Sequence, residues 1–148
     1  MFSKEFLITF IVNIFIGMGF NAMNMMAYDI SHLYVSVTLF YVGCIMASNM
    51  VWSHEIIHYL NHGMFNFNTF LLGVVMTLFF VYLARNQVGV NKDQWFRRMI
   101  PHHSTALTTS EKLLENNDKL DKTTKKLAKD IIDVQNKEID LMKKLLKN

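Results

Sequence analysis

Two histidines and a methionine lie within one helical turn in the second half of the chain. The segment from Trp95 to Ser104 contains Met99, His102 and His103. Thioether sulfur and imidazole nitrogen are soft and borderline ligands, and together they suit copper, above all Cu(I). Pro101 lies beside the histidines, where it either kinks a helix or marks its start. This segment predicts a metal site, provided that other side chains complete it.

A helix expected over residues 121–147 supplies the missing side chains. Its stripe positions are four and three residues apart, the heptad rhythm of a bundle helix. One position holds the charged Glu138, and Met142 follows one turn later. The stripe is Leu127, Ile131, Val134, Glu138, Leu141 and Leu145.

The helix expected over residues 92–115 carries a matching stripe, and residues 116–118 have the composition of a turn. The antiparallel hairpin that results places Met99 opposite Glu138, and His103 opposite Val134. His102 lies one residue off the stripe, so it either turns inward or faces a neighbouring subunit. The stripe is Phe96, Met99, His103, Ala106, Ser110 and Leu113, and the predicted metal ligands are His102, His103, Met99, Glu138 and Met142.

The same residues have a second interpretation without a metal. His103 and Glu138 would form a buried hydrogen-bonded pair, and such a pair fixes the register of packed helices. The sequence alone leaves both interpretations open.

A second histidine cluster lies at residues 54–62. His54, Glu55 and His58 match the zinc peptidase string, with two histidines on one helix face and a glutamate as general base, but no third ligand motif accompanies them. Met50, His54, His58 and His62 also recur every four residues, so they predict a possible second metal site leading out of an apolar helix. The alternative is that these histidines are polar caps at a helix end.

Composition divides the chain into an apolar and a polar part. Residues 6–84 are almost uncharged, whereas residues 111–148 hold ten lysines and eight acidic residues. The apolar runs at about 6–28, 33–52 and 65–84 are each long enough to cross about 30 Å of hydrocarbon. We therefore expect an all-α protein with a three-span membrane domain over 1–84, a linker over 85–92 and a soluble helical hairpin over 93–148. The net charge of +3, with both signs interleaved, argues against nucleic-acid binding.

The hairpin is too small for a sufficient core of its own. Two hairpins packed as a four-helix bundle would solve this problem. We expect a homo-oligomer formed through the hairpin, or docking of the hairpin onto the membrane domain, with membrane lipid as the other partner.

The hairpin sequence resembles the domain-of-unknown-function 305 family. Trp95, residues 99–103, Leu127-Ala-x-x-Ile131, Gln135 and Glu138-Ile-x-x-x-Met142 carry the resemblance, and the preceding apolar runs are similar to the membrane-anchored branch of that family. The resemblance implies a ferritin-like half bundle and metal handling, with copper bound by some relatives. The loop between the second and third runs departs from those relatives, because it holds histidines and no Lys or Arg.

The expected function is membrane-anchored metal binding, most of all of copper, in binding or homeostasis rather than catalysis. One alternative is a dimerising interaction module without metal, and another is a small membrane peptidase using His54, Glu55 and His58. Arg85, Lys92, Arg97 and Arg98 would place the hairpin in the cytoplasm, whereas the resemblance favours the extracytoplasmic side. We expect the latter.

Overall fold

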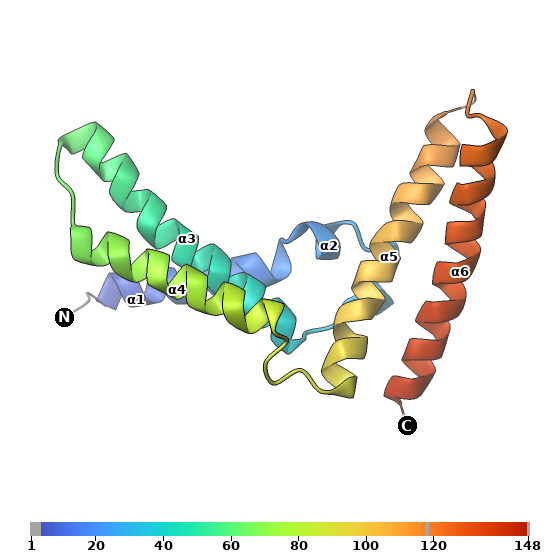
Figure 1. The fold of residues 1–148 in the computed structure, drawn as a ribbon, viewed down its shortest axis with the longest axis horizontal. Coiled ribbons are helices and arrows are strands. Elements are labelled where there is room, and N and C mark those ends of the chain that lie inside the picture. Colours follow the sequence, from blue (N-terminus) through green and yellow to red (C-terminus); the bar gives the residue numbers. More distant parts are fainter. Residues whose placement is uncertain (1–3, 118, 148) are drawn as a thin grey trace. The chain divides into compact units, whose positions relative to one another are not determined.

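The computed structural model describes residues 4–117 and 119–147, so Asp118 of the expected turn lies outside the described residues. Every regular element in these ranges is a helix, which confirms the all-α class (Figure 1). The chain forms two compact units, residues 1–21 with 37–90 and residues 22–36 with 91–148. The elements are α1 (Lys4–Gly19), α2 (Ala22–Met25), the short 3-10 helix η1 (Ile30–His32), α3 (Val37–His62), α4 (Phe67–Arg85), α5 (Lys92–Asn116) and α6 (Lys122–Leu146).

The first unit is built around α3, which packs against both α1 and α4. Glycines allow these close contacts. A Cβ atom at Gly43 would lie 2.5 Å from the carbonyl oxygen of Ile14 in α1, and one at Gly73 would lie 2.8 Å from the backbone nitrogen of Trp52 in α3. Small residues at helix contacts let backbones approach in this way, as in helices packed within membranes.

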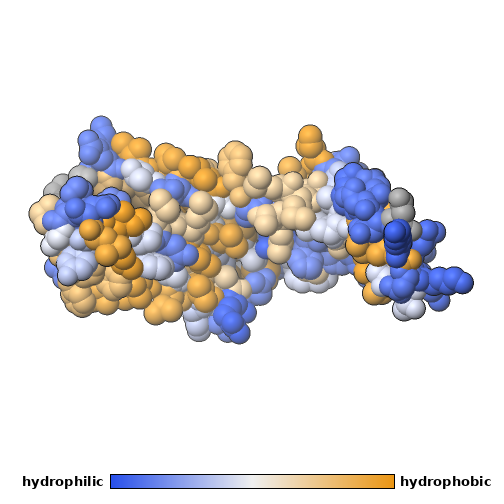
Figure 2. All heavy atoms as spheres, turned by 90° about the horizontal axis from the view of Figure 1, so that it is seen from above, coloured by the Kyte–Doolittle hydropathy of each residue, from blue (hydrophilic) through white to orange (hydrophobic). Residues whose placement is uncertain are grey.

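The outer surface of this unit is rich in apolar side chains (Figure 2). Among the described residues, α4 is the one helix that is both long and apolar enough to cross a membrane. The α3 helix is longer, but it continues through the polar residues 53–62. One of the three expected spans therefore has a clear counterpart, and the three-span arrangement stays a prediction.

The apolar run at residues 6–28 is not a single helix. The α1 helix ends at Gly19, where the side chain of Asn21 donates a hydrogen bond of 2.7 Å to the carbonyl of Met18. Asparagine side chains compete in this way with the helical hydrogen-bond ladder. Residues 22–36 then belong to the second unit. Hydropathy averaged over this run indicated a span, because a single asparagine near the end of α1 changes the average little.

The second unit is a hairpin of α5 and α6, which lie side by side in opposite directions (Figure 1). The side chains of Asn91 and Asp121 cap the two helix starts by accepting backbone hydrogen bonds. Pro101 lies inside α5, so it does not mark the start of the helix. The hydrophobic core of the hairpin is formed by Phe96, Ile100, Leu107, Ile139 and Met142.

Segment 22–36 lies against one side of this hairpin. The Tyr28 amide donates a 2.7 Å hydrogen bond to Oγ of Ser104. The hydroxyl of Thr105 donates to the carbonyl of Met23 at 3.2 Å, and Nζ of Lys143 donates to Oγ of Ser31 at 2.9 Å. The hairpin is therefore covered on this side by a segment that contacts both of its helices.

The stripe predicted on α6 is not its packed face. Leu127, Val134 and Leu141 are 59%, 47% and 55% exposed, whereas Ile139 and Met142 are 2% and 6% exposed. The face packed on α5 is displaced by one residue from the predicted stripe. The sequence carries two adjacent apolar stripes on α6, and the heptad pattern selected the one that faces away from the core.

Candidate functional site

His103 and Glu138 meet across the α5–α6 hairpin. Nδ1 of His103 lies 2.9 Å from Oε2 of Glu138. The carboxylate does not approach along the direction that a hydrogen bond requires, so Nδ1 is buried without a hydrogen-bond partner. The contact is best described as a short electrostatic pair. It lies one helical turn from the predicted register, which placed Met99 opposite Glu138.

The neighbouring His102 is exposed, and its ring centroid lies 5.9 Å from that of His103. Partial burial lowers the pKa of His102, and the nearby His103 and Arg98 lower it further. The lowered pKa favours the neutral imidazole, which is the form that binds metals. His102 therefore lies beside the pair while remaining open to solvent.

The two methionines belong to the hydrophobic cluster of the hairpin. Met142 is a buried member of it, and the half-buried Met99 packs against it. Because the packed face of α6 is displaced by one residue from the predicted stripe, Met142 lies on the face packed against α5. The described part of one chain holds no group of three or more His, Cys, Asp or Glu residues placed to hold a metal ion. The structure thus brings His103 to Glu138 but does not gather all five predicted ligands.

Sequence reasoning missed a buried polar contact at His32. Nδ1 of His32 lies 2.9 Å from Oγ of Ser104, and the two residues are 8% and 0% exposed. Burial lowers the pKa of His32, and Lys143 lowers it further, while Asp29 and Asp140 act in the opposite direction. Treating residues 22–28 as part of a span hid this contact, and the spacing of 72 residues gave no signal for it.

The docking of segment 22–36 should weaken in acid. His32 has a lowered pKa when docked, so below about 6.5 the undocked segment binds more protons and docking is lost as the pH falls toward the lowered value. Hydrogen exchange of the Tyr28 amide, corrected for its intrinsic pH dependence, should accelerate in acid. His32→Gln should remove this acceleration, and His62→Gln, at an exposed histidine, should keep it. Acceleration that persists in His32→Gln would show that another group is responsible.

The histidines at the end of α3 have local structural partners. Glu55 Oε2 accepts a hydrogen bond of 3.1 Å from the Asn66 amide, and Nδ1 of His58 lies 3.1 Å from the carbonyl of Met64. Both contacts hold the turn between α3 and α4. The ring centroids of His54 and His58 lie 6.0 Å apart, and those of His58 and His62 lie 5.0 Å apart. Through these contacts Glu55 and His58 have partners in the α3–α4 turn, and the second metal site stays a prediction.

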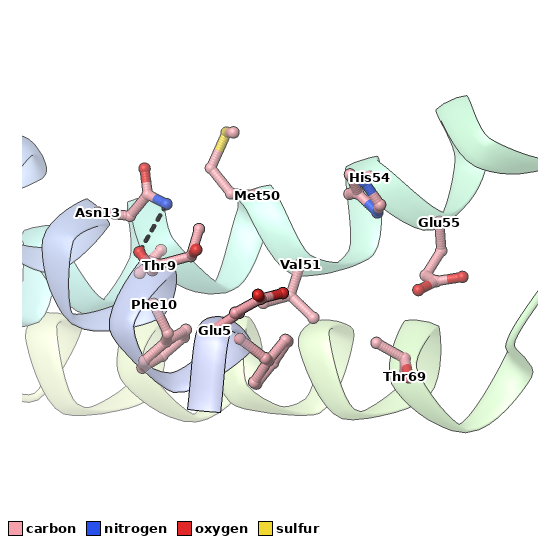
Figure 3. A pocket seen from close by; sticks show the side chains of 11 residues that line it. Glu5, Thr9, Phe10, Asn13, Met50, Val51, His54, Glu55 and Thr69 are labelled. Carbon is pink, nitrogen blue, oxygen red and sulfur yellow. Dashed lines mark hydrogen bonds between the residues drawn. The ribbon is translucent and has the colours of Figure 1, made fainter. Parts of the chain in front are cut away.

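A cavity of about 550 Å³ lies next to this turn within the first unit. Figure 3 shows His54 and Glu55 of α3, Glu5 of α1 and Thr69 of α4 around it. Met50 also lines it but is 49% exposed. Neither His58 nor His62 lines the cavity, so the predicted second metal site of Met50, His54, His58 and His62 is not gathered around it.

Comparison with known proteins supports the family resemblance for the second part of the chain. Residues 82–148 match the family model of the Domain of unknown function (DUF305). An uncharacterized protein of Acanthamoeba polyphaga mimivirus is 28% identical over 144 residues, which cover 97% of this chain and 93% of that protein. No solved structure matches. The similarity to the viral protein extends over both units, beyond the region that the family model matches.

Proposed function

We propose that this protein is a membrane-anchored metal-binding protein whose site is centred on His103 and Glu138, and that its metal is copper. The observation that carries the proposal is the buried Nδ1 of His103, which has no hydrogen-bond partner and faces a carboxylate oxygen at 2.9 Å. An unsatisfied buried polar group costs about 1–3 kcal/mol. Coordination of a cation would satisfy this nitrogen and the carboxylate together.

The residues around this pair fit copper. His102 adds a second imidazole beside His103, and Met99 adds a thioether one turn before it. Imidazole with thioether is a donor set for copper, Cu(I) above all, and the carboxylate of Glu138 serves as a ligand or orients an imidazole. Met142 is buried in the core, so it joins the site only after a local rearrangement. When a copper ion is bound, the protein would store or transfer it and would not catalyse a reaction.

The first unit supports the membrane anchor in this proposal. Helix α4 has the length and hydropathy of a span, and many large apolar side chains of α1, α3 and α4 are exposed. Such a surface is covered by lipid in a membrane protein. We propose that all three helices anchor the chain and that the hairpin lies on the extracytoplasmic side. Labelling of a cysteine introduced at the exposed Asn117 by a membrane-impermeant reagent on intact cells tests the side.

One alternative function is favoured by a specific observation. The His103–Glu138 pair joins α5 to α6, and a structural pair of this kind can fix the register of packed helices in an interaction module. The two functions differ in whether the protein retains a metal. The peptidase alternative has no comparable support, because Glu55 and His58 contact the α3–α4 turn.

A competition among metals tests the proposal. The full-length protein in detergent micelles is incubated with equal amounts of Cu(I), Zn(II), Fe(II) and Mn(II) without oxygen, desalted and analysed for each metal. Retention of copper in preference to the others is expected, because the thioether and imidazole donors favour it. Retention of no metal would leave the interaction module as the function, and preferential retention of manganese would contradict the proposed donor set.

A further inference from the structure

An apolar stripe runs along the exposed side of α6. Its members Leu127, Val134, Leu141 and Leu145 are 38–59% exposed, and Ile131 and Glu138 complete it. Segment 22–36 contacts the hairpin through Ser104, Thr105 and Lys143, none of which belongs to the stripe. At 3.6 residues per turn, Lys143 lies well around the helix from Leu141 and Leu145. The stripe is therefore on a side of α6 that this segment leaves open.

The candidate metal site opens onto the same side. Glu138 is a member of the stripe, and its side chain is 47% exposed, whereas that of His103 is 15% exposed. Within the described residues of one chain, too few ligating side chains gather to hold a metal ion. The apolar stripe is thus exposed, and the metal site is short of ligands, on the same side of α6.

We propose that a second copy of this chain covers the stripe, with the two α6 helices antiparallel, and that its His103 and Glu138 complete the metal site. This proposal rests on the proposed function. The stripe has the same spacing read in either direction about residue 136. In an antiparallel pair, Leu127 meets the partner's Leu145, Ile131 meets the partner's Leu141, and Val134 meets the partner's Glu138. A two-fold interface requires this kind of self-complementarity.

Charges beside the stripe favour the antiparallel direction. Asp130 and Lys144 flank the stripe on its edge away from α5, and in this arrangement Asp130 comes close to the partner's Lys144. A parallel pair would instead place each stripe residue against its own copy, so two Glu138 carboxylates would meet in an apolar seam. Like charges at such positions are unfavourable. The antiparallel arrangement avoids that encounter.

The arrangement changes what the site can bind. Glu138 lies two residues from the centre of the stripe, so the two Glu138 residues are offset by four residues, or about 6 Å along the helices. Each Glu138 is in contact with His103 on α5 of its own chain. Two imidazoles and two carboxylates therefore gather near the two-fold axis, with His102 of each chain beside them. A soft to borderline divalent or monovalent metal ion is the ligand that this set would take.

Cysteine pairs test the direction of the contact. Two differently tagged copies of the full-length chain are produced together in detergent micelles, each with Cys44→Ala. One copy carries Leu127→Cys and the other Leu145→Cys. Mild oxidation should link the two tags, and chains that all carry Leu127→Cys should stay unlinked. Linking among Leu127→Cys chains would show a parallel pair, and no linking in either mixture would show that another surface covers the stripe. Both outcomes overturn the proposal.

A charge placed in the stripe tests the link to the metal site. Leu127→Lys places a charge against the partner's Leu145, so it should convert the dimer into a monomer in light scattering and weaken Cu(I) binding at least tenfold, although His103 and Glu138 are intact. The matched control is Asn136→Lys, on the opposite face of α6, which should change neither property. Equal helical content in circular dichroism shows that both variants are folded.

The outcomes separate this proposal from the proposed function. A Leu127→Lys monomer that binds Cu(I) as the unmodified protein does would overturn the shared site while leaving metal binding in place. An antiparallel dimer that binds no Cu(I) would overturn both the shared site and the metal-binding function, and would establish the interaction module. A monomeric unmodified protein would overturn the dimer.

Discussion

Replacing Ile100 with alanine should lower the free energy of unfolding of the hairpin unit by about 2–5 kcal/mol. Ile100 is 0% exposed and lies in the cluster that joins α5 to α6. The truncation removes buried apolar surface and leaves a cavity that the surrounding side chains only partly fill. Because stabilities of small units are themselves only several kcal/mol, this variant should be close to unfolding.

Urea unfolding of the hairpin unit measures this loss. In a Trp52→Phe background, Trp95 is the one remaining tryptophan and reports on α5. The matched control is Ile30→Ala in the same unit, where the side chain is 86% exposed, and this variant should unfold within about 0.5 kcal/mol of the unmodified protein. Similar losses for the two variants would contradict the assignment of the core.

Replacing Glu138 with glutamine should lower the affinity for Cu(I) about 10- to 100-fold, the usual effect of losing a carboxylate that binds or orients at a metal site. The amide keeps the shape of the side chain but loses its charge, and the carboxylate lies 2.9 Å from Nδ1 of His103. Anaerobic titration against a chromophoric Cu(I) chelator measures the affinity.

Glu115→Gln is the matched control for Glu138→Gln. Glu115 lies near the end of α5 and pairs with Lys112 on the surface, so its replacement should leave Cu(I) affinity unchanged. Equal effects of the two substitutions would indicate a general loss of negative charge. A Glu138→Gln variant with full affinity would remove the carboxylate from the site and leave the structural pair as its role.

The helical class and the hairpin were predictable from periodicity, because residues 92–116 and 122–146 alternate apolar and polar positions at helical spacing. The contact of His103 with Glu138 could also be predicted, since both are polar residues at heptad positions. Their register was wrong by one turn, because the length of the connection between the two helices sets it and composition does not fix that length.

The packed face of α6 was not predictable in the same way. Its core residues Ala128, Ile139 and Met142 and the exposed stripe are both apolar at helical spacing, so periodicity alone could not choose between them. The docking of segment 22–36 on the hairpin was not predicted for another reason. Its docking depends on Ser104 and His32, which are single polar residues far apart in sequence. Tertiary contacts of this kind leave no periodic signal.

The copper content of the full-length protein, with and without the two adjacent histidines, tests the central claim most directly. The protein is loaded with Cu(I), desalted and analysed for metal per chain. The unmodified protein should retain copper in a fixed ratio to the chain, and the His102→Ala/His103→Ala variant should retain only background, while His54→Ala/His58→Ala/His62→Ala should match the unmodified protein. Equal copper in the unmodified protein and the His102→Ala/His103→Ala variant, or none in either, would contradict the account.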